Sequence, residues 1–159
     1  MGLPSLDFPM HKQVRIINPY RTYPDDPYAF GEIPHIAHKK TGATRLRAGR
    51  IYLQYGHHYV SGGFGWKHIK IKHEAKIAEM CHGISVFEYI NAVTTGYQCI
   101  VHQSNDTFVL MKYNGATKFL ALNPKEMEGV QFYNIGTGFP RDRMYDLIKR
   151  GDEVIWGEM

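Results

Sequence analysis

After Gly96 the chain changes to a pattern that constrains the fold more than any other part of the sequence. Four β-prone runs follow one another: YQCIVHQ, TFVLMKY, TKFLALN and VQFYNIG. Asn105-Asp106 and Asn114-Gly115 separate the first three runs, and Asn-Gly is a strong hairpin signal. NPKEMEG joins the third run to the fourth. We therefore expect these runs to form a consecutive antiparallel meander.

Alternation along these runs assigns side chains to faces of the sheet. In the second run Lys112 is expected to share a face with Phe108 and Leu110. In the fourth run Thr137 is expected to follow Tyr133 and Ile135 on one face. PRDRMYDLIKRG then predicts a short closing helix, and EVIWG predicts a final short strand.

Two helices are expected ahead of the meander. Ser85 and Glu88 form a capping box, in which each side chain accepts from the other residue's backbone N–H, and Gly96 ends that helix. The segment WKHIKIKHEAKIAEMCHG predicts the earlier helix, which Gly83 ends. The predicted fold class is α+β, with two N-terminal helices packed on a four-stranded antiparallel meander.

The chain of 159 residues has the length of a single domain, and its start differs from the remainder. Residues 1–43 contain prolines at 4, 9, 19, 24, 27 and 34 among many tyrosines, which predicts an irregular Pro/Tyr-rich arm. A partner-docking segment is the alternative for this arm. Residues 44–159 are expected to form a nuclease-like functional domain, beginning with a strand in which Ile51, Leu53 and Tyr55 alternate with Tyr52 and Gln54.

Charge and hydropathy limit the classes of partner. The net charge is +4 without counting nine histidines, which suits RNA, DNA or an acidic membrane surface. No apolar run is long enough to span a membrane, and MGLPSLDFPM lacks the pattern of a signal peptide. Cysteines occur only at 81 and 99, which fits a reducing compartment. A cytoplasmic protein without a membrane partner is expected.

The stretch from Gly56 to His73, GHHYVSGGFGWKHIKIKH, holds the candidate chemistry. It contains four histidines, three lysines and four glycines in eighteen residues. Histidine titrates near neutral pH and can act as an acid or a base, while a cation can stabilise a charged phosphorane. RNA carries its own 2′-OH nucleophile, whereas DNA cleavage usually requires a metal held by carboxylates. The stretch has no Asp or Glu, so the pattern favours RNA cleavage without metal or cofactor.

Spacing restricts how these residues combine. His57 and His58 point to opposite faces if the strand continues, so only one of them enters a cleft. His68 and Lys72 are i, i+4 neighbours on a helix, whereas His73 lies about 140° away from His68. His68 and His73 would share a helical face only if the helix began after Lys70.

Other cations are candidates for holding the RNA backbone. Arg45, Arg47 and Arg50 lie next to the first strand of the domain and predict a positive edge that steers RNA. Lys70 and Lys112 are added as RNA-binding candidates.

These residues carry a resemblance to a known group of nucleases. RLRAGRIYLQYGHH, GFGWKHIKIKH, the helical pair, the meander and the late YNIGTGFP resemble the superfamily that unites barnase, EndoU, colicin-type tRNases and RelE, particularly its phage and contact-dependent toxin members. The resemblance covers roughly residues 45 to 157. It implies a metal-independent, toxin-like endoribonuclease with a barnase/EndoU/colicin/RelE-like fold.

The resemblance also implies roles for individual residues. His58 matches the family's Gly-x-His histidine, His68 and His73 match its His-Ile…His pair, and Thr137 matches its late threonine. With Lys72 as electrostatic stabiliser, these residues form the expected catalytic set. RNA, with tRNA as one candidate, is the expected substrate in the cytoplasm of a bacterial host cell, and a cognate inhibitor or immunity protein is a candidate partner.

Two other function classes remain open on sequence grounds. A non-catalytic nucleic-acid or protein-binding module of phage origin could use the basic face alone. An ADP-ribosyltransferase-like enzyme could use a small sheet with His and aromatic residues, although the chain has no Gly-x-Gly-x-x-Gly motif and no clear Arg…Glu-x-Glu arrangement.

Overall fold

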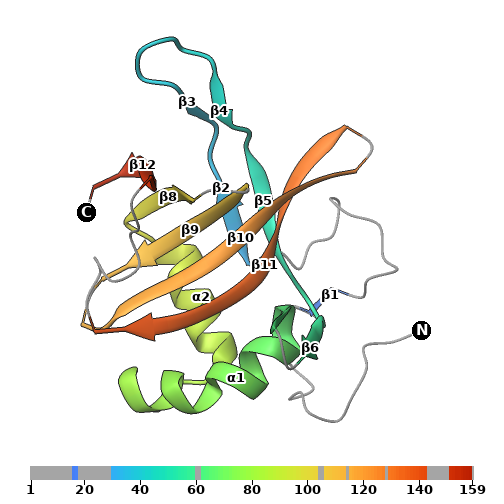
Figure 1. Cartoon of the computed structure of the whole chain (residues 1–159), viewed down its shortest axis with the longest axis vertical. Coiled ribbons are helices and arrows are strands. Elements are labelled where there is room, and N and C mark those ends of the chain that lie inside the picture. Colours follow the sequence, from blue (N-terminus) through green and yellow to red (C-terminus); the bar gives the residue numbers. More distant parts are fainter. Residues whose placement is uncertain are drawn as a thin grey trace.

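The computed structural model describes residues 16–17, 30–59, 62–103, 106–113, 115–127, 129–142 and 151–158. Two helices and twelve strands occur in these ranges (Figure 1). The helices are α1 (Gly65–Met80) and α2 (Val86–Gly96). The strands are β1 (Ile16–Ile17), β2 (Gly31–Ile33), β3 (Ile36–Ala37), β4 (Thr44–Leu46), β5 (Gly49–Gln54), β6 (His57–Tyr59), β7 (Gly62–Phe64), β8 (Cys99–Gln103), β9 (Thr107–Lys112), β10 (Thr117–Met127), β11 (Val130–Arg141) and β12 (Glu153–Gly157).

The main sheet is mixed and curled, and it is larger than the sequence predicts. Its strand order is β1-β5-β11-β10-β9-β8-β12, and β2 also pairs with β5. β8 to β11 pair antiparallel in chain order, but β5 joins β11 in parallel. The predicted fold class, two N-terminal helices on a four-stranded antiparallel meander, is therefore wrong. Hairpin signals identify only strands that are adjacent in the chain, whereas the β5–β11 pairing closes a gap of about eighty residues.

Residues 30–37 contribute both strands and core. β2 pairs antiparallel with β5, and β3 pairs with β4 in a separate two-stranded sheet. Phe30, Ile33 and Ile36 are buried in the main hydrophobic core. Strands of two or three residues are too short to show a period of two, so proline and turn residues dominate the sequence pattern there.

The two helices are formed where the sequence predicts them. The capping box at the start of α2 is confirmed: Glu88 N–H donates to Ser85 Oγ at 3.1 Å, and Ser85 N–H donates to Glu88 Oε1 at 3.1 Å. Val86, Ile90 and Val93 are buried along its inner side. Figure 1 shows α2 crossing one face of the sheet and α1 lying beside β11. Within the described residues, neither helix is long and apolar enough to cross a membrane.

A buried hydroxyl fixes α2 to the sheet. Tyr89, fully buried on α2, donates to the Phe119 carbonyl at 2.9 Å and accepts from the Phe119 N–H at 2.8 Å. Burial raises the pKa of the Tyr89 hydroxyl well above its usual value. A Cβ added at Gly138 would lie 2.6 Å from Leu120 Cδ1, so β11 passes closely over this junction.

A β-bulge changes the face of the late threonine. Ile135 pairs with Leu122 and Thr137 pairs with Ala121, so Gly136 is the extra residue on β11. Paired residues of an antiparallel ladder share a face, and Leu122 and Ala121 are on opposite faces. Thr137 therefore does not follow Tyr133 and Ile135 on one face, because the bulge shifts the alternation by one residue.

The C-terminal predictions have separate outcomes. The predicted final strand is confirmed as β12, which pairs with β8. Pro140 and Arg141, at the start of the predicted closing helix, instead belong to β11. The rest of that helix prediction lies at 143–150, outside the described residues.

Replacing Tyr89 with phenylalanine tests the junction between α2 and the sheet. We expect Tyr89→Phe to lower the free energy of unfolding by about 1–3 kcal/mol, because the Phe119 N–H and carbonyl lose a buried partner. Urea unfolding measures this change. Tyr97→Phe is the matched control, since the Tyr97 hydroxyl donates to the Glu32 carbonyl at 2.9 Å where water can replace it. Equal losses in the two variants would contradict this account.

Candidate active site

A short hairpin and the start of α1 bring two histidines into contact. β6 pairs with β7, and α1 begins immediately after β7 at Gly65. His58 Nδ1 lies 3.2 Å from His68 Nδ1, so one ring donates and the other accepts. His68 is only 4% exposed, whereas His58 is half-buried. Of the two histidines that compete for a cleft by alternation, the structure therefore directs His58 inward.

His73 extends this contact into a row of three rings. Its ring centroid lies 5.5 Å from that of His68 in an edge-on arrangement. The sequence predicts that these two histidines share a helical face only if the helix begins after Lys70; α1 begins at Gly65, and their rings are nevertheless in contact. Helical side chains lean toward the N-terminus, so the His73 ring reaches back over the preceding turns toward His68.

Strand β11 supplies the opposite wall of the site. Phe139 stacks on His73 with ring centroids 4.7 Å apart, and Arg141 Cζ lies 4.7 Å from the centroid of Phe139 on β11. Thr137 precedes Phe139 by two residues and therefore shares its face. Thr137 Oγ1 is buried and has no hydrogen-bond partner among the described residues.

Phe139 and Arg141 are site residues that the sequence analysis missed. The signal that could have found them is the alternation Thr137, Phe139, Arg141 on β11, but Pro140 was taken as the start of a helix. Proline is acceptable here because β11 pairs only with β10 at this position in the described structure.

Burial and nearby cations disfavour protonation of His68 and His73. Burial, followed by His68, Lys72, Lys76 and Arg141, lowers the pKa of His73 to about 4. Burial, followed by His58 and Lys72, also lowers the pKa of His68. Both effects disfavour an imidazolium, because charge is costly to bury and nearby cations repel it. An anion bound here would reverse the repulsion and favour protonation.

The glycines of the predicted stretch leave room for the histidine pair. Gly63 has φ +155°, and a Cβ added to it would lie 2.3 Å from the His57 carbonyl oxygen and 2.9 Å from His68 Nδ1. Gly62 has φ +147°, and a Cβ there would meet nothing within 4 Å. Gly63 is therefore required by the close approach of both β6 and His68, while Gly62 is required only by its backbone conformation.

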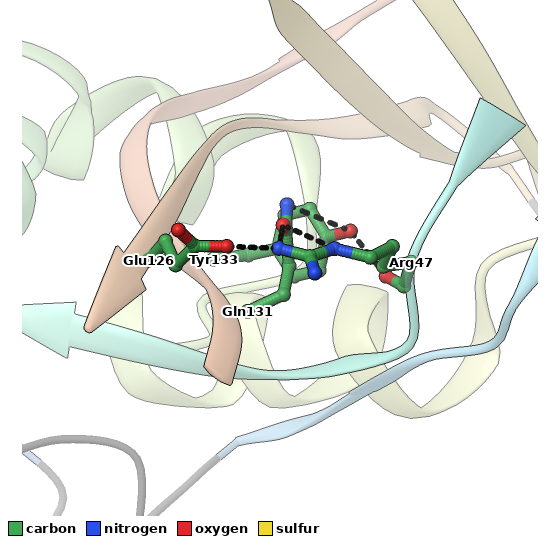
Figure 2. A network of polar contacts seen from close by, with 4 residues as sticks. All are labelled: Arg47, Glu126, Gln131 and Tyr133. Atoms are coloured by element: carbon green, nitrogen blue, oxygen red, sulfur yellow. Dashed lines mark hydrogen bonds and ion pairs between the residues drawn. The ribbon is translucent and has the colours of Figure 1, made fainter. Parts of the chain in front are cut away.

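Two of the predicted RNA-binding arginines are held elsewhere by ion pairs. Arg45 makes two hydrogen bonds to the Glu153 carboxylate, at 3.0 and 2.8 Å. Figure 2 shows Arg47 held by Glu126 and Gln131, while Tyr133 donates to its backbone carbonyl. These arginines lie at the opposite end of β5 from β6 (Figure 1), roughly 20 Å away for six residues of strand. They are not part of the histidine site.

The other cations predicted to bind RNA lie on separate elements of the fold. Arg50 is exposed on β5. Lys70 pairs with Glu74 at 3.0 Å, and its ammonium lies 5.4 Å from the centroid of the Trp66 ring. A Cβ added at Gly96 would lie 2.8 Å from Lys112 Nζ, which places this ammonium at the C-terminal end of α2, where a cation is favourable. Lys72 alone of the predicted cations lies close enough to lower the pKa of both His68 and His73.

The assembled site therefore consists of imidazoles, cations and a hydroxyl. We call His58, His68, His73, Lys72, Thr137 and Arg141 the histidine site. Among the described residues, no group of three or more His, Cys, Asp or Glu side chains is arranged to hold a metal ion. The site can attract an anion and exchange protons with it.

The chain was compared with known proteins. No protein-family model, curated protein or solved structure matches it.

Gly63→Ala tests whether the hairpin positions His68. We expect this substitution to break the contact between His58 and His68 and to change the NMR titration curve of His68, because the new methyl group would overlap the His57 carbonyl oxygen in β6 and crowd His68 Nδ1. Gly62→Ala carries a similar backbone strain without the contact and should leave that curve unchanged. The same shift in both variants would contradict the argument.

The pKa of His73 predicts how stability depends on pH. A pKa of about 4 in the folded protein, against roughly 6.5 when unfolded, means that the unfolded chain binds the additional proton between these values. Stability from neutral His73 is therefore present above pH 6.5 and is lost as the pH falls toward 4. Allowing for solvent screening, we expect a loss of about 1–2 kcal/mol. His73→Gln should abolish this component, whereas His57→Gln, at an exposed ring, should retain it.

Proposed function

We propose that this protein is a metal-independent endoribonuclease that uses histidine acid–base chemistry to cleave RNA. The observation that carries the proposal is the row of His58, His68 and His73, joined by the 3.2 Å ring contact. Two imidazoles that can exchange protons, beside cations, are the groups that this reaction requires. The resemblance to the barnase, EndoU, colicin and RelE nucleases supports the same reaction.

The reaction begins with proton removal from the RNA. A neutral imidazole of the site accepts the proton of the 2′-OH, and the 2′ oxygen attacks the adjacent phosphorus. The lowered pKa values of His68 and His73 favour the neutral form that a base requires. The bond from phosphorus to the 5′ oxygen then breaks, and a protonated imidazole donates its proton to that oxygen. The products are a 2′,3′-cyclic phosphate and a 5′-OH.

We assign different catalytic roles to the three histidines from their burial. His58 and His73 are half-buried and can meet a bound phosphodiester, whereas His68 is 4% exposed and lies between them. We assign the two proton transfers with substrate to His58 and His73. His68 orients His58 through the ring contact and exchanges a proton with it. Binding of the phosphate anion raises the pKa of these rings, which allows one of them to hold the proton of the acid.

The phosphorane charge is stabilised by side chains from two elements. Lys72 on α1 and Arg141 on β11 approach the histidines from either side and are both exposed. This assignment replaces the expected steering by Arg45 and Arg47 near the reacting phosphate, since both are paired with carboxylates. Thr137 Oγ1 is buried away from solvent and has no partner in the described structure, so we assign it no contact with the phosphate.

The biological role proposed for this activity is that of a phage or bacterial toxin acting in the host cytoplasm. That role follows from the resemblance alone. A cognate inhibitor that covers the histidine site would accompany it.

Incubation with total cellular RNA in excess EDTA tests the proposed reaction. We expect fragments that end in 2′,3′-cyclic phosphate. His58→Ala and His73→Ala should each reduce the rate by about 100-fold or more, because each removes one proton-transfer group. His68→Ala should also reduce it by misplacing His58.

His38→Ala is the matched control, because His38 is an exposed histidine that follows β3 and belongs to neither β6 nor α1. It should retain most of the activity. Intact RNA with folded wild-type protein, or equal activity in the His58 and His38 variants, would overturn the proposal.

A further inference from the structure

The outer face of the β6–β7 hairpin carries aromatic rings that are open to solvent. Tyr59 is 57% exposed and Phe64 is 38% exposed. His57 lies between them, with ring centroids 5.8 Å from Tyr59 in a stacked arrangement and 5.7 Å from Phe64 in an edge-on arrangement. We call these three residues the aromatic platform. Exposed rings held against one another offer flat apolar surface at a fixed position.

The platform and the histidine site share one short strand. His57 and Tyr59 point to one side of β6, and His58 between them points to the other side, where it contacts His68. Phe64 is the cross-strand partner of His57 on β7. A ligand strand that passes the rim of this two-stranded ribbon therefore contacts the platform beside the reacting groups, since His57 and His58 are adjacent residues.

The charge that follows the platform in the chain is positive. Every charged side chain from His57 to His73 is basic, namely Lys67, Lys70 and Lys72, of which Lys70 pairs with Glu74. Lys67 is exposed, and its ammonium lies 5.9 Å from the centroid of the Tyr55 ring beneath the hairpin. Exposed lysines do not favour an apolar protein surface as the ligand. An unpaired nucleobase attached to a phosphate chain matches both the rings and the cations.

We propose that the aromatic platform binds an unstacked nucleobase next to the scissile phosphate, which makes single-stranded RNA the substrate class. This inference rests on the proposed ribonuclease function. The base stacks on Tyr59 and its phosphates lie toward the lysines of α1. Duplex RNA is excluded from the platform because its bases are already stacked within the helix.

A binding measurement with an uncleavable ligand tests the platform separately from catalysis. The probe is a fluorescently labelled single-stranded RNA with 2′-O-methyl groups throughout, which lacks the nucleophile. Fluorescence anisotropy at one fixed salt concentration gives Kd. We expect Tyr59→Ala to weaken binding about tenfold, since one base loses its stacking partner, whereas Tyr59→Phe keeps the ring and should bind like wild type.

Trp156→Ala is the matched control. Trp156 lies on β12, away from the hairpin, and is 38% exposed like Phe64. Its ring contacts that of Tyr97. This variant should leave Kd unchanged. A duplex of the same sequence should bind wild type and Tyr59→Ala equally. Unchanged single-strand affinity in Tyr59→Ala overturns the platform, as does an equal loss for duplex. If RNA stays intact in the cleavage assay while Tyr59→Ala weakens single-strand binding, the platform stands and the nuclease proposal fails.

Discussion

The packing of α1 against the edge of β11 is the constraint on which the rest of the structure depends. β11 pairs with β10 along most of its length, but it pairs with β5 only at Phe132, Tyr133 and Asn134. Beyond that point α1 lies beside it (Figure 1). The stacking of His73 on Phe139 occurs at this contact, and His68 lies on the turns before it. A strand in the place of α1 would cover the groups that form the site.

The electrostatics of the site follow from that packing. α1 presents Lys72 and Lys76 to the same side as its histidines, and β11 adds Arg141 from across the contact. Partial burial removes water that would stabilise a charged ring, so protonation of His68 and His73 is disfavoured. The cations make the site positive even when these two histidines are neutral. An anionic ligand would lower the cost of protonating an imidazole in such a site.

The fold also separates two sets of basic residues that look alike in the sequence. Arg45 and Arg47 face carboxylates from β12 and β10 and serve to join distant strands. Lys72 and Arg141 lie close enough to His73 to lower its pKa, and Arg141 also packs on Phe139. Net charge predicted an anionic partner but could not distinguish these sets, because pairing depends on contacts between residues about a hundred positions apart.

Local signals in the sequence determined the helix α2, the helix α1 and the consecutive pairing of β8 to β11. The capping residues at Ser85 and the Asn114-Gly115 hairpin signal each involve only a few consecutive residues, so both can be recognised in the sequence. The composition of the stretch around His58 and His68 also predicts acid–base chemistry there. Only the tertiary structure decided that β5 pairs with β11, that a bulge turns Thr137 to the other face, and that Phe139 and Arg141 join the histidines. These outcomes depend on long-range contacts and on one extra residue in a strand, neither of which leaves a periodic pattern.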